Sequence, residues 1–224
     1  MNVVEASGLG KRYGRTWALR ECTLEIPAGR VAALVGPIGA GKTTLLNLAV
    51  GLTTPSAGAV TVLSGRRAGS RAALDGIAFV AQDTPLYRHL TVADMIYVTR
   101  SLNRRFDRSY AMARLAELGI PPKRKAGKLS GGQQAQLALT LALARRPRLL
   151  VLDEPVAMLD PVARHDFMAT VLTAMADDGV SVLLSRGQVR LAGEVGGLLA
   201  AHGRASLEEL ALAYLRETTP EVLR

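Results

Sequence analysis

The feature that most constrains this chain is a glycine-rich loop at residues 36–44. Its sequence, GPIGAGKTT, matches the pattern G-x-x-x-x-G-K-[ST] and lies between apolar segments at residues 30–35 and 42–50. The first segment predicts a strand and the second a helix. Backbone N–H groups of such a loop and the positive end of the helix face the same anion. The loop therefore predicts a site for the phosphates of ATP, formed by Gly36, Pro37, Ile38, Gly39, Ala40, Gly41, Lys42, Thr43 and Thr44.

Two side chains of this loop have chemistry of their own. Lys42 supplies a positive charge for the β- and γ-phosphates, and Thr43 offers a hydroxyl to Mg²⁺. We therefore expect ATP and Mg²⁺ as the ligands of this chain.

The composition fits a globular chain and leaves the partner open. The 224 residues are 49% hydrophobic and 21% charged, enough for one domain or one core with an inserted lobe. The net charge of +9 suits nucleic acid, a bound nucleotide, anionic lipid headgroups or an arginine-rich solvated surface. No signal peptide is expected, and no segment approaches the roughly 20 apolar residues of a membrane span. The lone Cys22 excludes an internal disulfide, fits a reducing compartment and is expected to be a core residue.

Strand and helix patterns along the chain predict an α/β fold. The region from Thr91 to Arg145 is helical, with Thr91 and Ser130 as expected N-caps and the pair Pro121-Pro122 dividing it into two parts. This helical region is expected to interrupt an α/β core of strands and helices. Further strands are expected at residues 2–6, 17–26, 59–63, 76–81, 149–152 and 180–184, and a further helix at residues 161–176.

Two acids follow the fully apolar strand at residues 149–152. Ligands of an open α/β sheet bind beyond the carboxyl ends of its strands, so Asp153 and Glu154 are expected near the phosphate loop. Asp153 is expected to hold Mg²⁺, and Glu154 to polarise an attacking water.

A second anion-binding pattern lies at residues 129–134, LSGGQQ, where a serine and two glycines precede a helix. This segment matches the signature of ABC transporter ATP-binding subunits, and the chain resembles that family over nearly its whole length. The resemblance implies a P-loop NTPase core with a parallel sheet, an N-terminal antiparallel β subdomain and an inserted α-helical subdomain. In the family, the signature of one subunit closes over the γ-phosphate held by another. Ser130, Gly131 and Gly132 are therefore expected to bind ATP in trans, in a homo- or heterodimer.

Other motifs match the family in order along the chain. Tyr13 resembles the aromatic residue that stacks on adenine, and Gln82 the glutamine that reaches Mg²⁺ and the attacking water. Asp160 resembles the aspartate that signals across the dimer. The resemblance thus implies Glu154, Gln82 and Lys42 as catalytic residues and Thr43, Gln82 and Asp153 as metal ligands.

Some positions depart from the family pattern. Ile38 stands where the family usually has asparagine. This difference is expected to leave phosphate binding intact, because the phosphates bind to backbone N–H groups. Residues 156–158, Val-Ala-Met, replace the usual small polar residues before Asp160. The largest departure follows Ser185, where the switch histidine and a connecting helix are expected and instead residues 186–194 resemble a later strand and turn. Two residues cannot connect parallel strands, so this segment either forms a hairpin or lies elsewhere.

The resemblance implies one ABC ATPase domain over residues 1–224. Within it, residues 1–82 and 146–192 are expected to form the catalytic core with the β subdomain, residues 83–145 the helical subdomain, and residues 193–224 a helical tail. The tail resembles that of drug-exporter ATPase subunits, which favours export.

We therefore expect an ATPase subunit held at the cytoplasmic face of the membrane by a separate permease, without a nucleic-acid partner. Two alternatives stay open. One is a non-transport ABC ATPase that acts on nucleic acid or ribosomes, which the basic charge would suit. The other is an ATP-binding pseudo-ATPase, because the loss of the switch segment is expected to alter or weaken turnover.

Overall fold

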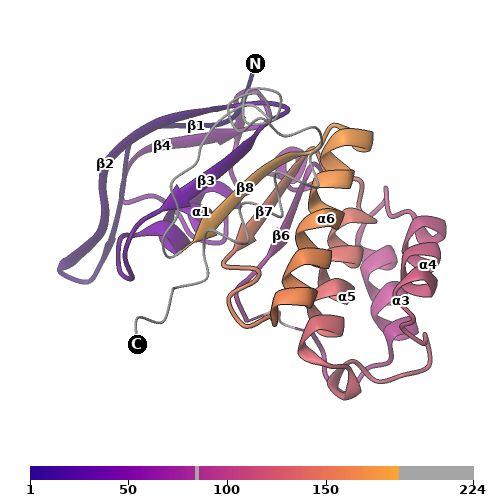
Figure 1. Cartoon of the computed structure of the whole chain (residues 1–224). Helices are drawn as coiled ribbons and strands as arrows, with labels where there is room; N and C mark the ends of the chain where they lie inside the picture. The colour runs from indigo at the N-terminus through magenta and orange to yellow at the C-terminus, as the bar shows by residue number, and fades with distance from the viewer. Residues whose placement is uncertain (84–85, 187–224) are drawn as a thin grey trace, which may run out of the picture.

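The computed structural model describes residues 1–83 and 86–186, and these residues contain two four-stranded sheets. The first has the order β2-β1-β4-β5 and is antiparallel throughout. The second has the order β3-β8-β7-β6 and is parallel throughout (Figure 1). The α/β fold with a parallel sheet and an antiparallel β part is thereby confirmed. The strands are β1 (Asn2–Tyr13), β2 (Thr16–Pro27), β3 (Val31–Val35), β4 (Ala57–Val62), β5 (Arg66–Arg67), β6 (Ile77–Val80), β7 (Leu149–Asp153) and β8 (Ser181–Arg186).

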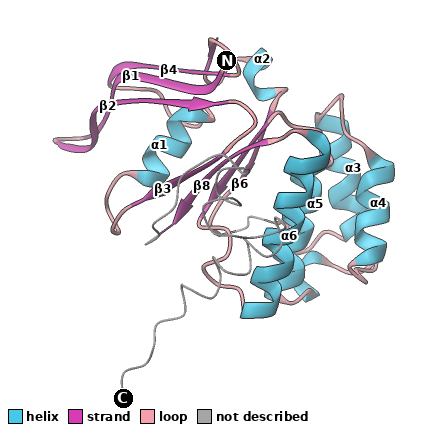
Figure 2. Cartoon of the chain, turned by 45° about the horizontal axis from the view of Figure 1, so that its top comes forward, coloured by secondary structure: helices cyan, strands magenta, loops and turns pink. Residues whose placement is uncertain are grey.

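Helices cover both faces of the parallel sheet, which explains why β7 is apolar at successive positions. Leu149 and Val151 pack in one cluster with α1 (Lys42–Ala49) and with β1 and β4 of the antiparallel sheet. Leu150 and Leu152 pack in a second cluster, with α5 (Gly131–Leu143) and α6 (Pro161–Asp178). The helix that follows the phosphate loop and the helix that follows the signature thus cover opposite faces of the sheet (Figure 2).

The helical region contains three helices, not the two parts expected from Pro121-Pro122 alone. These are α3 (Val92–Leu102), α4 (Arg108–Glu117) and α5, with a short 3₁₀ turn at Ala126–Lys128. The extra break arises at Asp107, whose carboxylate accepts a hydrogen bond from the Tyr110 N–H and starts α4. The expected N-caps are confirmed, since Thr91 and Ser130 each form a capping box.

The N-terminal strand is longer than the expected residues 2–6, and it continues to Tyr13. Register shifts between Ala6 and Leu9 and between Leu9 and Lys11 accommodate the glycines within it, and Gly8 has a φ of 52°. β1 and β2 therefore form one long hairpin with Tyr13 at its turn. The patterns also missed β5 and the short helix α2 (Arg71–Leu74).

Arg146 joins the helical region to the core. Its guanidinium donates to Asp107 Oδ2 at 2.9 Å and to Asp178 Oδ2 at 3.0 Å, and it lies 4.7 Å from the centre of the Tyr110 ring. The hydrogen bond from the Tyr110 N–H and the bond from Arg146 both hold the pKa of Asp107 below its usual value. The start of α4, the end of α5 and the end of α6 are thus joined by one side chain.

This junction makes stability depend on pH. A carboxyl whose pKa is lower in the folded state stabilises that state above its unfolded pKa of about 3.9, and loses this effect as the pH falls through the folded value. Asp107→Asn keeps an N-cap and removes the charge, so we expect a loss of up to about 1 kcal/mol at pH 7 for this partly exposed network. Urea unfolding of the parent and of Asp107→Asn, at pH 7 and in a more acidic buffer, measures this loss of unfolding free energy.

The difference between the parent and Asp107→Asn should shrink in acid. Asp177→Asn is the matched control, an exposed acid of α6 for which the described residues offer no ion pair. A difference that stays the same at both pH values would contradict the assignment.

Candidate functional site

The phosphate loop leaves β3 at the carboxyl edge of the parallel sheet and enters α1. Gly39 and Gly41 have φ values of 86° and 85°, in the left-handed region that favours glycine. A Cβ at Gly41 would lie 2.5 Å from the Ala18 carbonyl oxygen, so no larger residue fits there. Pro37, Ile38, Gly39 and Ala40 are exposed, and the loop is open to a ligand from solvent.

Lys42 reaches back over the loop from the first position of α1. Its Nζ donates to the carbonyl oxygens of Gly36 at 2.8 Å and Pro37 at 3.1 Å, and lies 3.9 Å from Glu154 Oε1. The structure thereby places Glu154, the residue after β7, beside the phosphate loop, as the sequence predicted. Glu154 has a φ of 43°, a conformation that is rare for a residue with a side chain and frequent at functional sites.

Ser185 completes this edge of the sheet and was not among the residues predicted. Its hydroxyl donates to Asp153 Oδ1 at 2.5 Å and accepts from the Glu154 N–H at 2.9 Å. Ser185 is fully buried at the end of β8, which lies between β3 and β7. One hydroxyl therefore fixes a carboxylate oxygen of Asp153 and the backbone of Glu154. The only feature of the sequence that could have identified Ser185 as a site residue is that it is a polar residue at the end of an apolar strand.

The expected metal ligands lie at the same edge. Asp153 is 2% exposed and ends β7, Gln82 follows the adjacent strand β6 and is exposed, and Thr43 is exposed in the first turn of α1. Over residues 1–83 and 86–186, no group of three or more His, Cys, Asp or Glu side chains is close enough to enclose a metal. A single buried carboxylate, with Gln82 and the Thr43 hydroxyl at the same edge of the sheet, fits Mg²⁺, which is usually held by few protein ligands together with phosphates and water.

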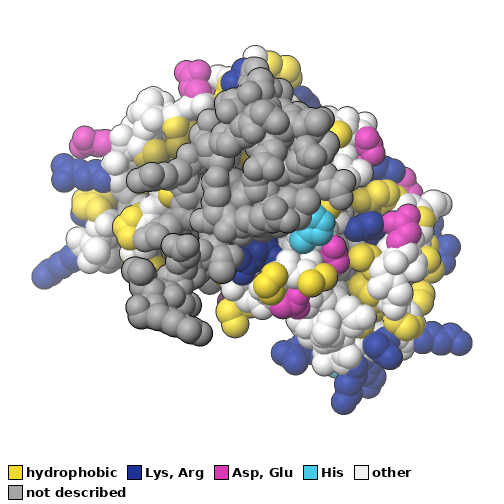
Figure 3. Space-filling model, in the orientation of Figure 1, with side chains coloured by type: hydrophobic (Ala, Val, Ile, Leu, Met, Phe, Trp, Pro, Cys, Tyr) yellow, Lys and Arg dark blue, Asp and Glu magenta, His cyan; other side chains and the backbone are white. Residues whose placement is uncertain are grey.

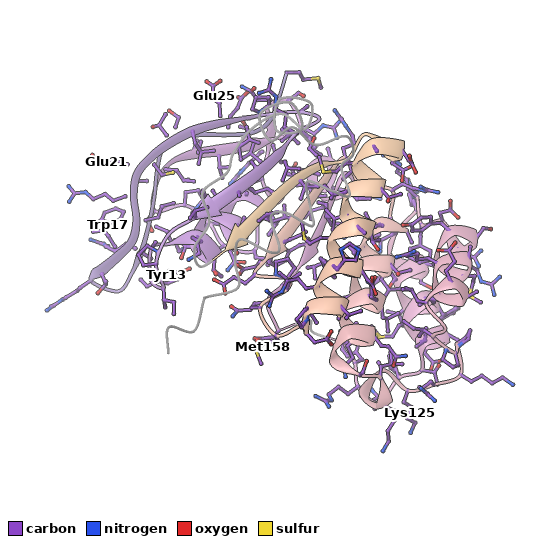
Figure 4. The ribbon with its side chains drawn as sticks, in the orientation of Figure 1. Tyr13, Trp17, Glu21, Glu25, Lys125 and Met158 are labelled. Atoms are coloured by element: carbon purple, nitrogen blue, oxygen red, sulfur yellow. The ribbon has the colours of Figure 1, made fainter. Side chains whose placement is uncertain are left out.

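Tyr13 lies at the turn of the β1–β2 hairpin, and the residue is 52% exposed (Figure 4). Lys11 Nζ lies 5.2 Å from the ring centre and donates to the Thr54 carbonyl oxygen at 2.8 Å. An exposed aromatic face beside a held cation is suited to stack on a planar ring.

The signature lies at the start of α5, on the other side of the sheet from α1. Ser130 Oγ accepts from the Gln133 N–H at 3.2 Å, which leaves its own proton free for another acceptor. A Cβ at Gly132 would lie 2.9 Å from the Ala163 Cβ, so the start of α5 packs closely on the start of α6. Asp160 caps α6 through the Ala163 N–H at 2.9 Å. The signature therefore lies beside the start of α6, which Asp160 caps. It does not lie beside the phosphate loop of the same chain, because α1 and α5 cover opposite faces of the sheet.

β8 ends at Arg186 as a parallel strand between β3 and β7. The segment at residues 186–194 that was expected as a later strand and turn lies outside the described residues after Arg186, as does the helical tail expected at residues 193–224. Among the helices that the structure describes, none has the length and apolar character that a membrane span requires.

The family model described as "ABC transporter" matches residues 19–157. The chain is 38% identical over 191 residues to an Fe(3+) ions import ATP-binding protein of Mesorhizobium japonicum, covering 82% of this chain and 53% of that one. It is 35% identical over 210 residues to a phosphonates import ATP-binding protein of Thiobacillus denitrificans, covering 86% and 80%. The chain thus spans about half of the iron relative and most of the phosphonates one. These relatives are named for import, so they do not support the drug-exporter subgroup.

Solved structures agree with this fold. A bacterial ABC transporter cassette solved as a dimer has a TM-score of 0.72 at 26% identity, covering 83% of this chain and 88% of that one. A second ATP-binding cassette of an ABC transporter has a TM-score of 0.72 at 27% identity, covering 86% and 83%. With a family model over more than half of its length and relatives of this identity, the chain belongs to the ABC transporter family and forms an ATP-binding ATPase domain of that family.

Proposed function

We propose that this chain works as one half of an ATPase dimer that powers transport through a separate membrane permease. The observation that carries the proposal is the group formed by Lys42, Glu154 and Asp153 with Ser185 at one edge of the sheet. In this group, the Lys42 cation can bind phosphates, the Glu154 carboxylate can polarise a water molecule, and the Asp153 carboxylate can bind a metal ion. The backbone N–H groups of the phosphate loop add hydrogen-bond donors for phosphates at the same edge of the sheet.

In this proposal the phosphate loop holds ATP through its backbone N–H groups and Lys42, and Tyr13 stacks on the adenine. The buried Asp153 and the Thr43 hydroxyl hold Mg²⁺, which neutralises phosphate charge when bound. Gln82 and Glu154 orient and polarise the attacking water at the γ-phosphate. Lys42, 3.9 Å from Glu154, balances the charge of that carboxylate before ATP enters.

The position of the signature supports a dimer. Because α1 and α5 cover opposite faces of one sheet, Ser130, Gly131 and Gly132 need a second copy to meet a phosphate loop. Three apolar residues of the phosphate loop and of the segment around Asp160 are also exposed to solvent: Ile38 is 98% exposed, Met158 90% and Val162 70%. Met158 projects away from the body of the protein from the loop after β7 (Figure 4). We propose that these side chains become buried between two copies, and that Asp160 lies at the same interface.

Met158→Ser is expected to weaken the ATP-bound dimer at least tenfold. Burial of a methionine side chain contributes about 1.5–3 kcal/mol to the free energy of association. A twofold interface contains two copies of Met158, so the substitution acts twice. Sedimentation of the Glu154→Gln chain with and without Met158→Ser, in saturating ATP, measures the dissociation constant of the dimer.

The matched control for this prediction is Leu102→Ser, at the end of α3, where the side chain is 79% exposed. This control should leave the dimer unchanged, and neither substitution should change ATP affinity in the monomer. An equal effect of both substitutions would contradict a specific role for Met158.

We propose import as the direction of transport, because the most similar relatives reported above are named as import proteins for iron ions and phosphonates. The earlier expectation of export has no support from them. The substrate is not inferred, since the permease would form the pathway. The proposal also includes a position at the cytoplasmic face of the membrane, where the permease holds the chain.

The basic charge is the observation that keeps a nucleic-acid ATPase as the second candidate. Figure 3 shows Lys and Arg at several separate places on one face of the molecule, including the end of the helical region where Figure 4 labels Lys125. A scattered distribution favours a solvated surface over a groove for a polyanion. Co-purification of the tagged chain with a polytopic membrane protein is the expected result. Nucleic-acid binding that falls steeply with salt would favour the second candidate instead.

A further inference from the structure

A pocket opens at the edge of the parallel sheet opposite the proposed nucleotide site. It lies at the amino ends of β7 and β8 and has a volume of about 350 Å³, within the range of small-molecule sites. Because the strands are parallel, this edge is the one farthest from Asp153 and Ser185. An occupant of this pocket would therefore not compete with ATP.

The pocket has an excess of positive charge. Arg105, Arg146 and Arg148 line it together with one acid, Asp178. Arg146 is compensated by its bonds to Asp178 and Asp107. Arg105 and Arg148 are exposed, and no carboxylate of the described residues forms an ion pair with either. Two guanidinium groups are thus available to a ligand.

The helix ends beside the pocket reduce this charge without removing it. α5 and α6 both end there, and a helix C-terminus carries roughly half a negative charge. Two such ends offset about one of the two free positive charges. The remaining field still favours an anion.

Ser181 adds a buried donor to the same wall. It is 2% exposed and its Oγ accepts from the Gly29 N–H at 2.8 Å, so that the hydroxyl proton is left to donate. No acceptor for this proton is found among residues 1–83 and 86–186. The other lining residues include the apolar Val3, Leu63 and Pro147.

We propose that this pocket binds a small organic anion, whose phosphate or carboxylate group bonds to Arg105, Arg148 and Ser181 while its apolar part lies against Val3, Leu63 and Pro147. Guanidinium groups pair with either head group through two parallel hydrogen bonds. Arg105 comes from the helical region, and Arg148 and Ser181 from the core, so the ligand also joins these two parts of the chain.

Ligand-observed NMR titration of the full chain tests the proposal with phenyl phosphate, benzoate and the neutral phenol. Saturating MgADP fills the phosphate loop, and a repeat in Lys42→Ala confirms that this loop is not the site measured. Saturable binding of phenyl phosphate or benzoate is expected, and their relative affinities identify the preferred head group. Binding of phenol equal to that of both anions, or no saturable binding of either anion at millimolar concentration, would overturn the proposal.

Variants identify the pocket as the site. Arg105→Ala/Arg148→Ala is expected to raise the dissociation constant of the anion at least tenfold, and Ser181→Ala several-fold. Arg105→Lys/Arg148→Lys retains the charge and is expected to recover part of the affinity. Arg15→Ala/Arg100→Ala removes two exposed arginines elsewhere and should change it less than twofold. An unchanged affinity in the first double variant, with its thermal unfolding like that of the parent, would contradict the site.

Discussion

Glu154→Gln is expected to bind ATP as tightly as the parent chain and to hydrolyse it at least 100-fold more slowly. Loss of a positioned general base costs about 10²- to 10⁴-fold in rate. The substitution preserves the shape of the side chain, and the bond from the residue 154 N–H to Ser185 does not depend on the carboxylate. Steady-state phosphate release and nucleotide binding, measured on the same preparations, separate the two effects.

The control for this prediction is Glu117→Gln, an exposed carboxylate of α4 that is 64% exposed and pairs with Arg114. It should turn over ATP like the parent. A rate in Glu154→Gln above about a tenth of the parent rate would exclude Glu154 as the base that activates water.

The parent rate itself tests the hypothesis of altered turnover. If residues 186–194 replace the switch segment, the parent chain should hydrolyse ATP slowly and its ATP-bound dimer should accumulate without Glu154→Gln. Turnover as fast as that of relatives with a switch histidine would contradict this hypothesis and leave the assignment of Glu154 intact.

Ser185→Ala is expected to lower the free energy of unfolding by about 2–4 kcal/mol, because it leaves one buried and one partly buried polar group without a partner. A buried unsatisfied group costs about 1–3 kcal/mol, and a partly buried one costs less because water can replace its partner. These groups are Asp153 Oδ1 and the Glu154 N–H. Since the hydroxyl also fixes the backbone that presents Glu154, the turnover rate should fall while Tyr13 and the phosphate loop still bind nucleotide. Urea unfolding and ATP turnover measure the two consequences.

Ser181→Ala is the matched control, since it removes a buried serine from the other end of the same strand. Its Oγ accepts only the Gly29 N–H in the described structure, so a smaller loss of stability is expected. Turnover should stay at the parent rate in Ser181→Ala. Equal losses of stability and rate in the two variants would show that Ser185 has no special relation to the site.

The elements predicted best were those whose signals are local. The phosphate loop follows from glycine backbone freedom and one lysine, the N-caps at Thr91 and Ser130 from their own side chains, and β7 from an unbroken apolar run. The prediction failed where several local signals compete. β1 continues through Gly8 and Gly10 because pairing with β2 and β4 on both sides stabilises an irregular strand. The break before α4 depends on Asp107, whose bonds to Arg146 bridge 39 positions.

The sequence by itself determined which groups this protein carries and in what order: a glycine-rich loop with a lysine, two acids at the end of a buried strand, and a capped signature. Only the tertiary structure decided which of these groups meet. Ser185 reaches Asp153 and Glu154 across 32 and 31 positions, and α1 and α5 lie on opposite faces of one sheet. Such contacts depend on strand order, which local patterns do not specify. The same holds for the arginines at the opposite edge, which are far apart in the chain and line one pocket only after folding.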